Sequence, residues 1–139
     1  MTRDEAIKTL SILKAAYPNS YRNMTKDEAN GTINIWALQF VNIPFTVVSI
    51  AINKLIGTNT FPPTVSEVKE KIRGLHWEAW QIVNDFEVLG LGNEKTVEKA
   101  KTILKITEPM QSRFRNEISL VDMLESGGAY LPEGKAQIE

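Results

Sequence analysis

A four-residue pattern, Thr-x-x-Glu, recurs three times in the first half of this sequence, at residues 2–5, 25–28 and 64–67. Each copy stands just ahead of a segment with helical periodicity. In a capping box of this kind the threonine hydroxyl accepts a hydrogen bond from the backbone N–H three residues on. The glutamate carboxylate in turn accepts one from the threonine N–H. The pattern therefore predicts three helix starts and favours a helical fold.

The connection ahead of the third pattern predicts where one helix ends. Gly57 is expected to adopt the left-handed geometry that closes a helix after Leu55 and Ile56. Two prolines follow Phe61, where they remove two backbone donors and favour extended backbone before Thr64. Because the prolines hold a large apolar side chain beside a capped helix, we expect Phe61 to pack against the core.

Apolar residues spaced three and four apart predict seven helices and no convincing strand, so the predicted fold class is all-α. Four helices form a compact unit within residues 1–74, where Gly74 ends the fourth. Their expected inward-facing residues are Ile7, Leu10 and Leu13; Ala29, Ile33, Trp36 and Phe40; Val48, Ala51, Ile52 and Leu55; and Val65, Val68 and Ile72. The third segment is rich in β-branched residues, which leaves strand as its alternative. Pro44 ahead of it and Gly57 behind it favour helix.

Three further helices are predicted behind Gly74. Their expected inward-facing residues are Trp77, Trp80, Val83 and Phe86; Val97, Ala100, Ile103 and Leu104; and Met110, Phe114, Ile118, Val121 and Leu124. Asn93 is expected to cap the sixth helix, and Thr107 and Pro109 to start the seventh. The predicted organisation is an N-terminal helical domain of residues 1–75, a C-terminal helical segment of residues 76–128 and a flexible tail of residues 129–139.

Composition argues against catalysis and against a membrane-bound protein. The sequence has no cysteine and a single histidine, His76, so neither a zinc site nor a histidine-based triad is expected. The segment Gly90-Leu91-Gly92 lacks the lysine and hydroxyl of a phosphate-binding loop. We therefore predict no catalytic residue, no metal ligand and no cofactor. The longest apolar run, residues 43–52, is about half the ~20 residues of a membrane span, and the lack of cysteine favours a cytoplasmic setting.

The charge of the chain is small and unevenly distributed. Residues 1–75 carry +3 and residues 76–139 carry −4, which gives the net charge of −1. Proteins that depend on phosphate contacts have a much larger basic excess. Strong direct binding of nucleic acid is therefore not expected.

Four segments of the N-terminal half carry a resemblance to a known family. They are Leu10-Ser11-Ile12-Leu13-Lys14-Ala15-Ala16-Tyr17-Pro18-Asn19, then Trp36, then Asn42-Ile43-Pro44-Phe45-Thr46-Val47-Val48 with Ala51, and finally Phe61-Pro62-Pro63-Thr64-Val65-Ser66-Glu67-Val68. In this order and spacing, over residues 1 to about 75, the chain resembles the phage loaders and inhibitors of the replicative DNA helicase.

The resemblance implies an all-α N-terminal domain and a protein without ATPase activity. Such a protein binds the hexameric replicative helicase, holds it inactive and delivers it to an origin-bound phage protein. Two alternatives stay open. One is a small helical DNA-binding module that uses Lys69, Lys71 and Arg73. The other is a phage-encoded inhibitor of a different host protein.

The family makes its helicase contact in the C-terminal part, and this sequence offers exposed candidates there. Residues that fall off the apolar stripe of the seventh helix, or lie in the tail behind it, are Arg113, Arg115, Asp122, Glu125, Tyr130 and Leu131. The two arginines flank an aromatic residue, an arrangement that suits an acidic partner or a nucleic-acid backbone, although solvated arginines on a helix surface are the commoner case. We predict that these six residues bind the partner.

Overall fold

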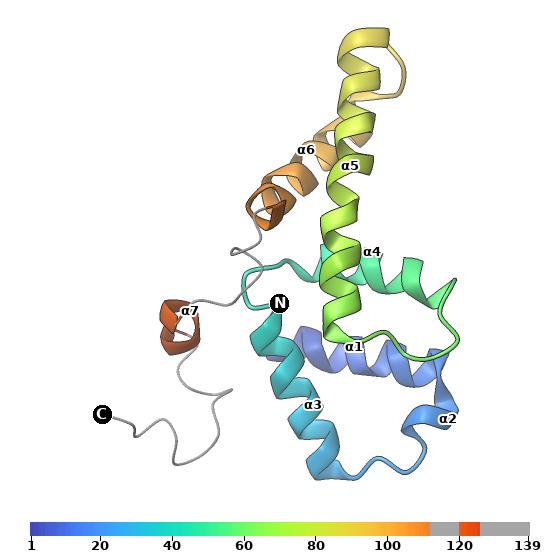
Figure 1. The fold of residues 1–139 in the computed structure, drawn as a ribbon, viewed down its shortest axis with the longest axis vertical. Helices are drawn as coiled ribbons and strands as arrows, with labels where there is room; N and C mark the ends of the chain where they lie inside the picture. Colours follow the sequence, from blue (N-terminus) through green and yellow to red (C-terminus); the bar gives the residue numbers. More distant parts are fainter. Residues whose placement is uncertain (112–119, 126–139) are drawn as a thin grey trace. The chain divides into compact units, whose positions relative to one another are not determined.

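The computed structural model describes residues 1–111 and 120–125, and the regular structure in these two ranges is entirely helical (Figure 1). The elements are α1 (Arg3–Ala16), α2 (Pro18–Tyr21), α3 (Lys26–Gln39), α4 (Phe45–Ile56), α5 (Val65–Leu89), α6 (Glu94–Thr107), the 3₁₀ turn η1 (Glu108–Gln111) and α7 (Leu120–Glu125). The predicted all-α fold is confirmed. The predicted tail, residues 129–139, and the expected core residues Phe114 and Ile118 lie outside the described ranges.

Contacts within the described chain divide it into two compact units. The first unit holds residues 1–65 and 120–125, and the second holds residues 66–111. The first therefore contains α1 to α4 and α7. The second contains nearly all of α5 with α6 and η1.

Capping boxes open α1 and α3 as the sequence predicts. The Thr2 hydroxyl accepts from the Glu5 N–H at 3.2 Å, and the Glu5 carboxylate accepts from the Thr2 N–H at 2.8 Å. Thr25 and Glu28 form the same pair of bonds at 3.1 and 3.3 Å. The bond from Thr2 lowers the pKa of the Glu5 carboxyl. Its stabilising effect on α1 is therefore present above the ordinary carboxyl pKa and is lost as pH falls through the lowered value.

The core of the first unit forms where α1 packs on α3 and α4. Its buried side chains are Ala6, Leu10, Leu13, Ile33, Trp36, Ala37, Phe40, Val47, Val48, Ala51, Ile52 and Leu55. The inward-facing residues predicted for the helices now labelled α3 and α4 are confirmed, except that Ala29 is only half-buried. Ile7 was predicted inward but is 38% exposed, and Thr9 is buried in its place. Thr9 tolerates burial because its hydroxyl donates to the Glu5 carbonyl at 3.0 Å.

The amino group of Met1 closes the far end of α3. It donates to the carbonyl oxygens of Phe40 at 2.8 Å and Ile43 at 2.7 Å, and burial lowers its pKa. Carbonyls at a helix C-terminus lack intrahelical partners and attract positive charge. The first residue thus satisfies acceptors that the end of α3 leaves open.

The connection between α4 and α5 differs from its prediction in two respects. Gly57 does follow the last residue of α4, but it is right-handed (φ −67°, ψ −18°). The turn is closed instead by the N–H groups of Thr58 and Asn59, which both donate to the Leu55 carbonyl at 3.0 and 2.7 Å. Phe61 is 76% exposed, so its predicted burial is wrong.

Proline, rather than Phe61, provides the buried side chain of this connection. Pro63 is buried and Pro62 half-buried. The Tyr17 hydroxyl donates to the Asn59 carbonyl at 2.9 Å, which ties the connection to the end of α1. The buried Pro63 and the Tyr17–Asn59 hydrogen bond fix the conformation of this connection, so burial of the Phe61 ring is not needed.

Helix α5 runs through Gly74, where the sequence analysis placed a helix end. The proposed domain boundary after residue 75 therefore falls inside a helix. A mid-helix glycine costs only about 1 kcal/mol relative to alanine. The apolar stripe of α5 continues across Gly74, with Val68 and Ile72 before it and Leu75 and Ala79 behind it, all four of them buried. The free energy gained by burying these four side chains exceeds the helix-propensity cost of Gly74.

Before Gly74 the predicted residues Val68 and Ile72 are buried, but behind Gly74 the face that α5 buries is not the predicted one. Trp77 is 64% exposed and Trp80 48% exposed, while Phe86 is half-buried. Leu75 and Ala79 extend the register of the earlier stripe, and the two tryptophans project about 100° or more from it at 3.6 residues per turn. Two stripes therefore compete in this sequence, and the aliphatic one is buried.

A buried histidine links α5 to α6, which lie side by side (Figure 1). His76 Nδ1 is 3.0 Å from the Thr107 hydroxyl oxygen. The Thr107 hydroxyl also donates to the Ile103 carbonyl at 2.9 Å. The other ring nitrogen, His76 Nε2, lies 3.7 Å from the Glu108 carboxylate, so both nitrogens of the buried ring have polar neighbours. An exposed ion pair, Lys101 with Glu87 at 3.6 Å, joins the same two helices further along.

The C-terminal helices also depart from expectation. Asn93 caps α6 as predicted, with its side chain accepting from the Thr96 N–H at 2.9 Å. Thr107 ends α6 instead of starting the next helix, because its hydroxyl bonds back into α6. Met110 is buried as predicted. Val121 and Leu124, expected inward, are 59% and 60% exposed.

We expect Phe61→Ala to change the free energy of unfolding by less than about 0.5 kcal/mol, because the ring buries little area. Phe40→Ala is the matched control. Phe40 is fully buried, so its truncation should cost about 3–5 kcal/mol. Urea unfolding of both variants measures the difference, and a large loss for Phe61→Ala would contradict the exposed placement.

Gly74→Ala should raise the free energy of unfolding by about 0.5–1 kcal/mol. A methyl group at residue 74 meets no atom within 4 Å, and the backbone there is helical. Gly90→Ala is the opposite case, since Gly90 has φ +69° and alanine is strained there. Thermal unfolding should shift up for the first variant and down for the second. A fall for Gly74→Ala would show that α5 is interrupted at this residue.

Thr107→Val should lower the free energy of unfolding by about 1–3 kcal/mol, because it leaves the buried Nδ1 of His76 without its hydrogen-bond partner. Thr102→Val is the control of equal size. Thr102 is exposed and donates only to the Glu98 carbonyl. Chemical denaturation compares the two, and equal effects would mean that the hydrogen bond to His76 contributes nothing to stability.

Candidate partner-binding surfaces

Most of the predicted partner-binding residues fall outside the described ranges. Arg113, Arg115, Tyr130 and Leu131 all do so. Asp122 lies in α7, but its side chain is not described. Glu125 is the last residue of α7 and is exposed. Because four of the six residues lie outside the described ranges, their assignment to one binding site stays a prediction.

Helix α7 shows exposed aliphatic side chains beside those positions. Leu120 is 69% exposed, Val121 59% and Leu124 60%. Three large aliphatic residues within one short helix are more than the scattered apolar residues of an ordinary surface. This concentration supports α7 as part of a binding surface.

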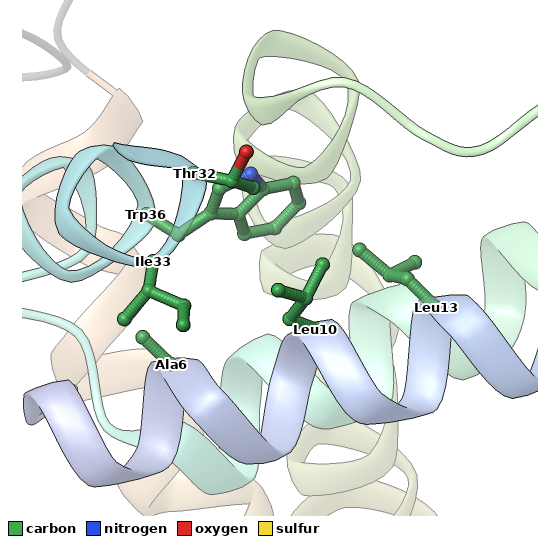
Figure 2. A pocket seen from close by; sticks show the side chains of 6 residues that line it. All are labelled: Ala6, Leu10, Leu13, Thr32, Ile33 and Trp36. Carbon is green, nitrogen blue, oxygen red and sulfur yellow. The ribbon is translucent and has the colours of Figure 1, made fainter. Parts of the chain in front are cut away.

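The first unit has a small apolar hollow between α1 and α3. It is lined by Ala6, Leu10, Leu13, Thr32, Ile33 and Trp36 (Figure 2). Its empty space is about 160 Å³, whereas small-molecule sites usually span roughly 300–1,000 Å³. In Figure 2 the side chains of α1 point toward those of α3 across the hollow. The hollow is therefore a feature of helix packing and not a ligand site.

The described residues offer little to a catalytic or metal-dependent reaction. Within residues 1–111 and 120–125 no group of three or more histidine, aspartate or glutamate side chains could hold a metal ion. The lone histidine is engaged with Thr107 and is 7% exposed. In the same part of the chain, no helix is both long and apolar enough to cross a lipid bilayer.

The aromatic pair on α5 is a surface that the sequence analysis missed, because both tryptophans were assigned to the core. The Trp77 ring meets the His76 ring edge-on, with centroids 5.2 Å apart and planes at 89°. Thr107 holds His76 by a hydrogen bond, so the Trp77 ring packs against a side chain that is itself fixed. Tryptophan and arginine are the residues most enriched at the energetic centres of protein interfaces. An exposed pair on one helix is a candidate binding surface.

Comparison with known proteins bears on the N-terminal half of the chain. Residues 1–69 match the family model for the N-terminal domain of a phage helicase loader and inhibitor. The match spans α1 to α4 and the first turn of α5. Neither a curated protein nor a solved structure matches the chain. The resemblance stated from the sequence is thereby confirmed, and residues 1–69 belong to the family of N-terminal domains of phage helicase loaders and inhibitors.

Proposed function

We propose that this protein is a non-catalytic phage replication adaptor, which binds and inhibits the replicative hexameric helicase and delivers it to the origin complex. The observation that carries the proposal is the match of residues 1–69 to the N-terminal domain of the helicase loaders and inhibitors. An adaptor of this kind works by binding alone, in the cytoplasm of the host cell. The partners are then the helicase and an origin-binding phage protein.

The basic cluster that motivates a DNA-binding alternative is poorly suited to phosphate. The Arg73 guanidinium is paired with the Glu70 carboxylate at 3.5 Å. Burial lowers the pKa of Lys69, and Lys71 is half-buried. A half-buried lysine and a paired arginine neutralise backbone phosphates less well than fully exposed cations do. We infer only weak, salt-sensitive binding of nucleic acid.

We place the helicase contact in the C-terminal part, on Arg113, Arg115, Asp122, Glu125, Tyr130 and Leu131. The exposed aliphatic residues of α7 support this placement, since they add apolar area next to Asp122 and Glu125. Interfaces of this kind depend on a few apolar anchors surrounded by polar contacts. Tyr130 with Leu131 is the anchor pair we propose.

The proposal is tested by mixing the purified chain with the host replicative helicase. We expect both to elute together in size-exclusion chromatography with multi-angle light scattering, and the ATPase activity of the helicase to fall as the chain is added. The chain alone should hydrolyse no ATP. Separate elution with unchanged ATPase activity would contradict the proposed function.

Truncation after Leu124 should weaken helicase binding at least tenfold, which corresponds to about 1.4 kcal/mol, while the melting temperature stays nearly constant. The double change Tyr130→Ala with Leu131→Ala should reproduce most of this loss in the full-length chain. Ile35→Ala is the control, because Ile35 is an exposed aliphatic residue on α3. Isothermal titration calorimetry gives the affinities. If the truncated chain binds as tightly as the full chain, the contact lies on another surface.

A further inference from the structure

Helix α5 has a second periodic stripe besides the one it buries. Its members are Arg73, Trp77, Trp80, Asn84 and Glu87, at successive spacings of four, three, four and three residues. This alternation places the five residues along one side of the helix, at the spacing by which two helices pack lengthwise. Trp77 and Trp80 are apolar and the other three polar; we call this stripe the seam. The buried stripe, Val68, Ile72, Leu75 and Ala79, lies on a different face. Helix α5 can therefore use one face within the protein and offer the other to a second helix.

The centre of this seam is aromatic and exposed. Trp77 and Trp80 are 64% and 48% exposed, and the Glu87 side chain at the end of the seam is 57% exposed. The edge-on contact with the buried His76 limits the freedom of the Trp77 ring. A side chain that is already ordered loses less conformational entropy on association. The seam is therefore accessible to a partner helix, and binding would cost Trp77 little conformational entropy.

The charges at the two ends of the seam indicate which helix fits. Arg73 lies seven residues before Trp80, and Glu87 lies seven residues after it. When two copies of α5 pack antiparallel about a two-fold axis at Trp80, Arg73 of each copy faces Glu87 of the other. Closed dimers are built from such self-complementary surfaces. We propose that the Trp77–Trp80 seam is a homodimer contact in which two copies of α5 pair antiparallel.

The ion pairs inside one chain do not oppose this contact. Arg73 is paired with Glu70 at 3.5 Å, and Glu87 with Lys101 at 3.6 Å. The Arg73 side chain is 33% exposed and the Glu87 side chain 57% exposed. Ion pairs at the surface contribute little to stability, so Arg73 and Glu87 can also pair with their counterparts in a second copy. Asn84 adds a polar residue on the seam, a type that fixes register between paired helices.

The size of the seam sets the strength of the dimer. A tryptophan side chain buries about 150–250 Å² when fully covered, and the four tryptophans of two copies are already partly covered. The contact therefore stays below the roughly 1,200 Å² of stable complexes. The dimer is weak, with a dissociation constant on the order of 10–100 µM.

Sedimentation velocity of the full chain, from about 5 µM to about 500 µM, tests the proposal. We expect a monomer at the low end and a dimer at the high end. Trp80→Ala should raise the dissociation constant at least tenfold, whereas Ile35→Ala, on an exposed face of α3, leaves it unchanged. A monomer at every concentration, or a dimer indifferent to Trp80→Ala, would overturn the proposal.

A charge exchange separates a seam contact from a loss of folding. Arg73→Glu alone and Glu87→Arg alone should each weaken the dimer, and the double variant should restore it, because opposite charges then face each other again. Failure of the double variant to restore the dimer, with its melting temperature unchanged, would exclude the antiparallel arrangement.

The tryptophan fluorescence of the monomer identifies a competing occupant. If the chain stays monomeric, but its emission shifts on adding the helicase or a single-stranded oligonucleotide, the seam serves that ligand and the homodimer is excluded. The homodimer does not depend on the proposed function, so either can fail alone.

Discussion

The packing of α1 against α3 is the interaction on which the N-terminal unit depends. Each of these helices has 14 residues, a length at which an isolated helix is marginal in water. They become stable by burying a shared stripe, with Leu10 and Leu13 on α1 facing Ile33 and Trp36 on α3 (Figure 2). Capping boxes fix where both helices start, and the amino group of Met1 satisfies the carbonyls where α3 ends.

Helix α5 differs from α1 and α3, because it leaves a large part of its apolar surface exposed to solvent. Its aliphatic stripe is buried, and its tryptophans are left to solvent. The histidine beside them is buried and held by a hydroxyl on α6. Such support for an exposed aromatic ring is unnecessary for folding alone, since a polar residue at position 77 would be as compatible with solvent. The exposed tryptophans are the observation from which we propose a binding role for α5.

Two groups of large apolar side chains are exposed in the described residues, the aliphatic residues of α7 and the tryptophans of α5. The two differ in chemistry, one aliphatic and one built from tryptophan with flanking charges. We propose the C-terminal part with α7 for the helicase contact and α5 for the contact with a second copy.

The sequence by itself determined the starts of α1, α3 and α6 and most of the N-terminal core. Caps such as Thr25 with Glu28 act over three residues, and stripes such as Ile33, Trp36 and Phe40 are set by local periodicity, so both can be read without tertiary contacts. The burial of Leu75 and Ala79 in place of the tryptophans was decided only by the tertiary structure, as were the continuity of α5 through Gly74 and the exposure of Phe61. Periodicity shows that residues share a face, but burial depends on what packs against that face. A mid-helix glycine shifts the local equilibrium by only about 1 kcal/mol, which the burial of apolar side chains exceeds.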